Sequence, residues 1–300
     1  MATIYTHASE NIAKTWLLLT FFFVFIIGLG WLLSQALGDS GFLYIAVAIA
    51  FFQSFFSYWF SDKIVLAMAG AKPIEKRDNP ELYRLVENLT IAAGLPLPKI
   101  YITNEAQPNA FATGRDKNHA VVAVTRGLLE RLDKPELEGV IAHELSHIGN
   151  KDMLLQTMVV ILVGIVAIIS DLFLRVSFWG GRRDDNDRGQ LGLILFAFGI
   201  VAAILAPLAA TMIQLAISRK REFLADASAA LLTRYPEGLA RALQKISSDS
   251  TPLRSAKDST AHLYISSPFR GKQAKSWLTN LFSTHPPIEE RIKILLEMSV

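Results

Sequence analysis

Two long apolar runs without a charged residue follow one another near the amino terminus of this chain. They extend from Trp16 to Leu37 and from Gly41 to Phe60, and only Gly38-Asp39-Ser40 separates them. As a helix, each run is long enough to cross the ~30 Å hydrocarbon core of a bilayer. Because three residues allow only a tight turn, we expect a transmembrane helical hairpin that returns the chain to its starting side.

The alternative interpretation of the first run is a secretory signal peptide. Its apolar stretch is longer than the usual ~7–15 residues, and its cleavage-like sequence Ser34-Gln35-Ala36 is weak, so a retained anchor is favoured. Composition agrees, because 51% of the residues are hydrophobic and 19% are charged, against the roughly 25% charged of ordinary globular chains. These values exclude a disordered, coiled-coil or collagen-like chain.

Two further apolar stretches, Met153–Ser170 and Leu191–Ile217, predict a second hairpin. They are less regular, since Asp171 and Arg175 follow the first of them and Pro207 interrupts the other. The fold class expected is therefore a predominantly α membrane protein with about four transmembrane helices and an α+β domain. Whether the second hairpin crosses completely is left open. The chain therefore divides into four parts. Residues 1–60 form the first hairpin and residues 153–217 the second, and the polar parts 61–152 and 218–300 together form the α+β domain.

Positive charge predicts the orientation of these segments. Residues 61–152 contain 12 Lys and Arg, residues 218–300 contain 13, and Lys14 precedes the first run. The positive-inside rule makes the side that they share cytoplasmic, although three arginines in the loop 177–190 oppose this assignment. The net charge of +3 is too small to indicate a nucleic-acid partner, so the expected partners are the lipid bilayer and protein substrates.

The first polar part has alternating helix and strand signals. A helix is expected from Asn79-Pro80 to Gly94, and a further one over Thr125–Leu132. Short strand-like runs lie between them, at Lys99–Thr103, Ala110–Thr113 and Ala120–Val124. A third helix begins near Pro135 and carries apolar residues at helical spacing as far as Ile148.

That third helix contains His143-Glu144-Leu145-Ser146-His147, an H-E-x-x-H pattern. Histidines four residues apart project from one helical face, so both imidazoles can bind one zinc ion at about 2.0–2.1 Å. Glu144 lies beside the first ligand and can act as general base on a water at the metal. The alternative is a surface helix with two solvated histidines, which the uncharged Leu145 and Ser146 disfavour. With no cysteine in the chain, any metal must be held by histidine and carboxylate.

A catalytic zinc needs a third protein ligand. Glu222 follows the fourth apolar stretch directly, just as His147 precedes the third, and Asp226 lies four residues beyond it. Asp226 can accept a hydrogen bond from a ligating histidine and fix its tautomer. The alternative is that both carboxylates form ion pairs along the helix with Arg219 and Arg221.

The remaining candidates are less specific. His285, in Thr284-His285-Pro286-Pro287, can stabilise an oxyanion, but a helix-capping turn fits the sequence equally well. Arg291 can pair either with an active-site carboxylate or with its neighbours Glu289 and Glu290. Three histidines without a partner pattern are expected at the surface, namely His7, His119 and His262.

Three motifs in the same order resemble the HtpX family of bacterial inner-membrane zinc metalloproteases, which are related to the CaaX prenyl proteases. They are the segment from His143 to Met153, the segment from Ser218 to Asp226, and Thr284–Pro287. Together with the two amino-terminal apolar runs, they extend the resemblance over nearly the whole chain. One departure is Lys151, where many relatives are expected to have glycine.

The resemblance implies a gluzincin-like site and a multi-pass protein of the inner membrane whose active site faces the cytoplasm. It implies His143, His147 and Glu222 as ligands of one zinc ion, Glu144 as base and then acid, Asp226 in support, and His285 as transition-state stabiliser. It also implies an exposed edge strand that binds substrate beside the active-site helix, formed by Asn109, Ala110, Phe111, Ala112 and Thr113. The implied function is endoproteolysis of misfolded or unassembled membrane proteins.

Two alternatives remain open. An intramembrane zinc protease would carry its H-E-x-x-H inside a span, whereas here the motif precedes the apolar stretch. A non-enzymatic zinc-binding membrane scaffold or chaperone accounts for the ligands but gives no reason for Glu144.

Overall fold

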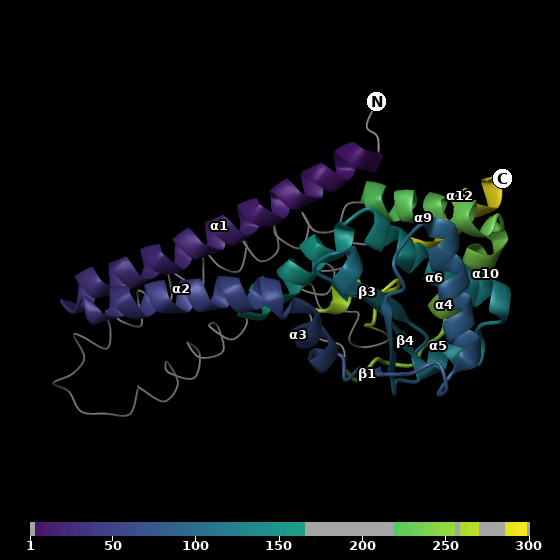
Figure 1. The fold of residues 1–300 in the computed structure, drawn as a ribbon, viewed down its shortest axis with the longest axis horizontal. Coiled ribbons are helices and arrows are strands. Elements are labelled where there is room, and N and C mark those ends of the chain that lie inside the picture. The colour runs from purple at the N-terminus through teal and green to yellow at the C-terminus, as the bar shows by residue number, and fades with distance from the viewer. Residues whose placement is uncertain (1–3, 166–218, 256–258, 270–285, 299–300) are drawn as a thin grey trace.

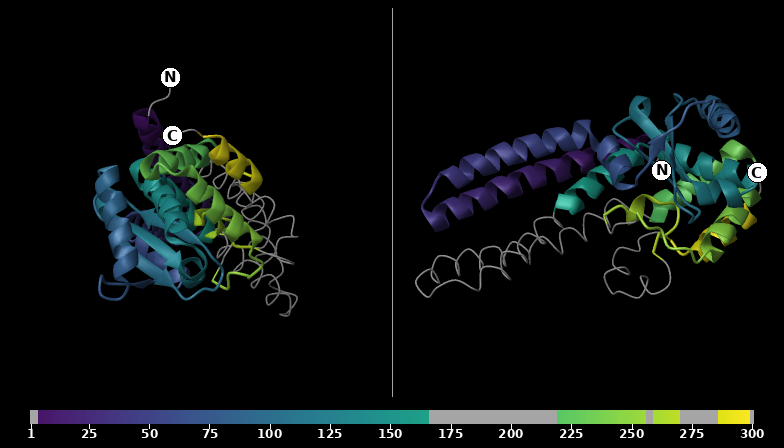
Figure 2. Two further views of the ribbon diagram at one scale, coloured as in Figure 1. Left: turned by 90° about the vertical axis from the view of Figure 1, so that its right-hand side faces the viewer. Right: turned by 90° about the horizontal axis from the view of Figure 1, so that it is seen from below.

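A helical hairpin projects from a body of mixed helices and strands in the computed structural model of the chain (Figure 1). The structure describes residues 4–165, 219–255, 259–269 and 286–298. The amino-terminal end of the hairpin lies beside the body, and its turn lies at the far end, as Figure 1 and the right-hand view of Figure 2 show. The helical hairpin expected from the two apolar runs is therefore present, with both of its open ends on the side of the body.

The hairpin consists of α1 (Ile4–Leu37) and α2 (Gly41–Trp59). In the turn, Gly38 adopts a left-handed φ of 66°, and the carboxylate of Asp39 accepts a hydrogen bond from the Gly41 N–H at 2.8 Å. The helices approach closely at Gly30, where an added Cβ would lie 2.1 Å from the Cβ of Ala46. Two helical segments are long and apolar enough to cross a membrane among the described residues, Asn11–Gly28 and Gly41–Trp59.

A third apolar helix, Asp152–Ile165, follows α6 (Lys134–Gly149) at an angle of 85°. Lys151 in the break has a φ of 58°, a conformation that glycine adopts more easily than other residues. The third helix packs on the hairpin in one buried cluster with residues of α1 and α2, formed by Leu18, Phe22, Ile26, Ala46, Ala50, Leu155, Val159, Leu162 and Val163. The rest of the predicted second hairpin, residues 166–217, lies outside the described residues.

A four-stranded mixed sheet forms one layer of the body, in the order β1-β2-β4-β3. β2 pairs with β4 in parallel, while β1–β2 and β3–β4 are antiparallel. The three strands expected from the sequence are present, each within a residue of its expected bounds. The bounds of the strands are β1 Lys72–Pro73, β2 Lys99–Thr103, β3 Ala110–Gly114 and β4 Ala120–Thr125.

Local signals explain where the helices of the body begin and end. Asn79 accepts a hydrogen bond from the Leu82 N–H at the start of α4, and Gly94 ends that helix in the left-handed conformation. Asp133 and Glu136 form a capping box at the start of α6. The remaining α-helices of the described body are α3 Ser61–Met68, α4 Pro80–Ala93, α5 Arg126–Arg131, α9 Arg219–Thr233, α10 Pro236–Ser248 and α12 Ile288–Glu297.

Helix α6 lies at the centre of the body, between the sheet and helices α9 and α10 (Figure 1). Its residues Val140, Ile141 and Leu145 are buried in the main hydrophobic core. At Gly139 the backbone of α10 comes so close that an added Cβ would lie 2.7 Å from the Leu239 nitrogen. This packing holds the helix that carries the H-E-x-x-H pattern on several sides.

Candidate metal centre

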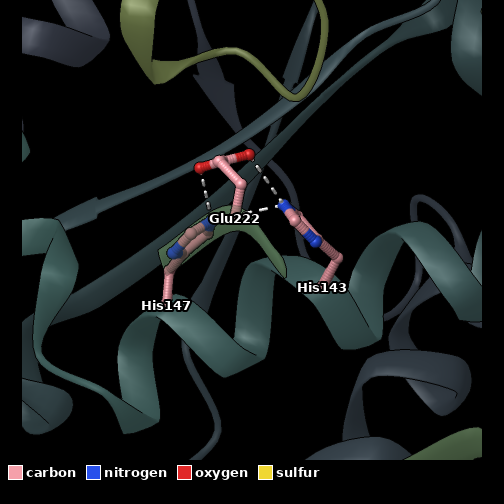
Figure 3. Close-up of side chains that lie close together, drawn as sticks. All are labelled: His143, His147 and Glu222. Carbon is pink, nitrogen blue, oxygen red and sulfur yellow. Dashed lines mark hydrogen bonds and ion pairs between the residues drawn. The ribbon is translucent and has the colours of Figure 1, made fainter. Parts of the chain in front are cut away.

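Helices α6 and α9 bring three side chains together, although residues 150–218 separate the two helices in the sequence (Figure 3). The Nε2 atoms of His143 and His147 lie 3.2 Å apart on one face of α6. The carboxylate of Glu222, from the first turn of α9, lies 3.8 Å from His143 Nε2 and 3.6 Å from His147 Nε2. All three side chains are buried.

The three side chains fit a divalent metal ion. Each offers one ligand atom, and these atoms all lie within 4.8 Å of one another. A tetrahedral zinc site with bonds of about 2.0–2.2 Å separates its ligand atoms by roughly 3.3–3.5 Å, close to the distances observed. Two imidazoles and one carboxylate are also the donor set of known catalytic zinc sites, which keep a fourth position open.

A buried ion pair contacts the Nδ1 atom of His143. Asp226 Oδ1 lies 2.9 Å from His143 Nδ1, and Arg291 of α12 donates to both oxygens of Asp226, at 2.7 and 2.8 Å. Of the two sequence-based alternatives for Arg291, the structure has the pairing with a carboxylate of the site. Burial would raise the pKa of Asp226, but the charges and hydrogen bonds of Arg291 and His143 together outweigh it and lower this pKa to about 2. The pKa of His143 is lowered, because burial and the charges of Arg291 and His147 together outweigh the opposite effect of Asp226.

A second carboxylate supports His147, and sequence reasoning missed it. Asp152 Oδ2 lies 3.1 Å from His147 Nδ1 and is buried at the start of the third apolar helix. Burial alone would lower the pKa of His147, but the hydrogen bond to Asp152 and the charge of Glu222 raise it to about 9. The available signal was an acidic residue five positions after His147, just where an apolar stretch begins.

Glu144 is buried beside these ligands. Burial raises the pKa of Glu144 to about 7, and the neighbouring charge of Glu222 acts in the same direction, whereas His147 opposes it. The backbone of Ala112 in β3 also favours the charged form of this carboxylate and so acts to lower its pKa. A carboxyl group with a pKa near 7 can both accept and donate a proton at neutral pH.

The strand β3 lies at the edge of the sheet, next to α6, but the expectation that it is exposed is wrong. All five of its residues are buried, and so is Asn109 before it. The backbone N–H of Ile265 donates to the carbonyl of Ala110 at 3.0 Å, and the Asn109 amide donates to the carbonyl of Ser266 at 2.9 Å. A segment of the carboxy-terminal part therefore covers this edge, and Tyr264 contacts Phe111 edge-to-face with ring centroids 5.2 Å apart.

The other histidines divide into three cases. His285 lies outside the described residues, and so does the side chain of His7. His119 is at the surface as expected, next to Asp116. The prediction for His262 is wrong: it is buried, and its Nε2 lies 3.1 Å from the carbonyl oxygen of Gln156, because residues 261–263 fold against the third apolar helix.

Comparison with known proteins agrees with this geometry. Residues 76–299 match the model of peptidase family M48. The chain is 44% identical to a protease HtpX homologue of Caldanaerobacter subterraneus over 99% of both chains. The chain belongs to the HtpX proteases of peptidase family M48. The resemblance drawn from its motifs is confirmed, and the protein is a membrane metalloprotease.

Further relatives extend the comparison. An HtpX homologue from Tropheryma whipplei is 46% identical over 98% of both chains, and one from Pyrococcus furiosus is 47% identical over 96% of this chain and 97% of its own. The crystal structure of Ste24p from S. mikatae superimposes with a TM-score of 0.50 at 20% identity. It covers 97% of this chain and 67% of the Ste24p chain, so the likeness extends over the fold as a whole.

Proposed function

We propose that this HtpX-family protein is a zinc endoprotease in which His143, His147 and Glu222 hold the metal. The observation that carries the proposal is the buried group of three ligand atoms within 4.8 Å, with the Glu144 carboxylate directly beside it. A zinc ion in this position would supply a Lewis acid for a peptide carbonyl and lower the pKa of a water toward ~7.

The residues of the chain would perform the proton transfers. Glu144 accepts a proton from the attacking water and then passes it to the leaving amine, for which a pKa of about 7 is suitable. Asp226 and Asp152 each accept a hydrogen bond from the far nitrogen of a histidine, which leaves the Nε2 lone pairs directed at the metal. Arg291 neutralises Asp226, and His285 is proposed to stabilise the oxyanion.

We further propose that an extended peptide pairs with the side of β3 that faces away from β4, from Asn109 to Thr113, in place of the segment that covers it here. Because alternate residues of an antiparallel strand face outward, the backbone groups of Ala110 and Ala112 are the ones directed away from β4. A peptide that bonds to the Ala110 carbonyl must replace the Ile265 N–H that holds it here. Pairing through the backbone tolerates varied side chains, which suits a protease of unfolded chains.

The proposed substrates are misfolded or unassembled membrane proteins, at the cytoplasmic face of a bacterial inner membrane. The hairpin supports this location, because its α2 exposes large apolar side chains that match a lipid surface, among them Phe51, Phe52, Phe55 and Phe56. The 12 Lys and Arg of residues 61–152 and the 13 of residues 218–300, against none in the turn Gly38-Asp39-Ser40, support the cytoplasmic side.

The test is casein hydrolysis by the detergent-purified full chain, with zinc content measured in the same samples. Glu144→Gln should retain zinc and lose at least about 10²–10⁴-fold in rate, because it removes the general base. Substantial hydrolysis by Glu144→Gln would refute the role of Glu144. If wild type binds zinc and cleaves no unfolded substrate, the protein is instead a zinc-binding scaffold or chaperone.

A further inference from the structure

The membrane hairpin contacts the support of the metal centre through one polar side chain. Asn11, on α1, is buried, and its Nδ2 donates a 2.6 Å hydrogen bond to Asp152 Oδ1. The same amide lies 3.4 Å from the carbonyl oxygen of Asn150. Asn11 is also the first residue of the membrane-crossing segment Asn11–Gly28. The two contacts therefore join the start of that segment to residues 139 and 141 positions later in the chain.

Asp152 uses its two oxygens on different partners. Oδ1 accepts from Asn11, and Oδ2 accepts from His147 Nδ1 at 3.1 Å. A hydrogen bond at Nδ1 places the proton on that nitrogen and leaves Nε2 of His147 as the ligand atom. The orientation of the Asp152 carboxylate thus sets both the tautomer and the direction of the imidazole.

The two histidines are supported in parallel ways from different parts of the fold. Behind His143, the carboxylate of Asp226 is fixed by the guanidinium of Arg291, on α12 in the body. Behind His147, the carboxylate of Asp152 is fixed by Asn11, on the membrane helix α1. Arg221 lies beside Asp152 as well, but its Nε is 3.9 Å from Oδ1, beyond hydrogen-bonding distance. The direct donor to this oxygen is therefore an amide from the hairpin.

We propose that Asn11 is a positioning residue for the metal centre, which acts through Asp152 on His147 and makes metal affinity depend on the packing of the membrane hairpin against the body. An apolar side chain would fill a buried position on α1 equally well, whereas only a donor can orient the carboxylate. The inference rests on the proposed zinc site, but its readout is metal binding and not proteolysis.

The experiment measures the zinc affinity of the full-length protein in detergent, by competition with a chromogenic chelator. Loss of a residue that orients a metal ligand typically weakens binding about 10–100-fold, which is expected for Asp152→Ala. Asn11→Leu, one step further away, should weaken it by about three- to tenfold. Thr15→Val is the matched control, because Thr15 is equally buried one turn along α1. Within the part of the chain that the structure describes, its hydroxyl bonds only to the Asn11 carbonyl. It should change the affinity less than about twofold.

A double-mutant cycle separates positioning from general destabilisation. In the Asp152→Ala background, Asn11→Leu should cause no further loss of zinc affinity, since the residue through which it acts is absent. Equal losses in both backgrounds, or unchanged affinity in Asn11→Leu, would overturn the inference. If Asn11→Leu does not fold, Asn11→Ala takes its place in the same cycle. If wild type binds no zinc, the proposed metal site fails and the inference with it.

Discussion

Removal of Arg291 should destabilise the protein more than any exposed charge can. Arg291 is fully buried, bonds to both oxygens of Asp226 and donates to the carbonyl of Ile265 at 3.0 Å. In Arg291→Leu, the carboxylate of Asp226 stays buried with His143 as its remaining close partner. Breaking one half of a buried ion pair costs about 3–5 kcal/mol. At about 2–4 °C per kcal/mol for a domain of 150–250 residues, the melting temperature should fall by roughly 6–20 °C.

The assay is thermal unfolding of the metal-free protein in excess chelator, so that a change in zinc affinity cannot contribute. Lys293→Met is the matched control on the same helix, because Lys293 is exposed and lies 3.9 Å from Glu297. It should change stability by less than about 0.5 kcal/mol. The double variant Arg291→Leu/Asp226→Leu should be more stable than Arg291→Leu, since the stranded charge is gone. An Arg291→Leu protein as stable as Lys293→Met, or a double variant with additive losses, would refute the reasoning.

Three further predictions concern metal binding and backbone geometry. Zinc affinity should rise about tenfold per pH unit from pH 7 to 9 and level off above pH 9. The reason is that His147, whose pKa is about 9 in the metal-free protein, must lose its proton to bind the metal. Chelator competition at several pH values measures this dependence. Gly139→Ala should lower the free energy of unfolding by about 1–3 kcal/mol, because its Cβ would collide with α10. Gly149→Ala, on the same helix with open space around it, should cause no such loss. Melting curves of the two variants test the pair. Lys151→Gly should raise stability by about 1 kcal/mol by relieving a left-handed φ of 58°, and an unchanged melting temperature would show that no strain is stored there.

Much of the site could be predicted because its determinants are local. The spacing of His143 and His147 fixes their common face on a helix whatever surrounds it. The apolar runs, the capping residues and the β-branched strands are local in the same sense, and the helices and strands of the first polar part lie close to their expected bounds. Glu222 and Asp226 were suggested by their position directly after the fourth apolar stretch of the sequence, and α9, which carries both, packs against α6.

The parts that sequence reasoning missed depend on contacts between distant segments. Nothing in the neighbourhood of Asn11 specifies Asp152 as its partner, because the packing of the hairpin on the third helix creates the contact. Tertiary packing likewise buries His262 against Gln156 and covers the edge of β3 with Ile265. The order of the sheet, with β4 between β2 and β3, is also a long-range property that the strand patterns do not determine.

The central claim is that His143, His147 and Glu222 bind zinc, and X-ray absorption at the zinc edge tests it most directly. The full-length protein should contain about one zinc, with nitrogen ligands at about 2.0–2.1 Å and an oxygen ligand at about 2.0–2.2 Å. Glu222→Gln should lose most of the metal, because it replaces a charged ligand. A wild-type protein without zinc, or a Glu222→Gln protein with the same zinc content and spectrum as wild type, would contradict the account.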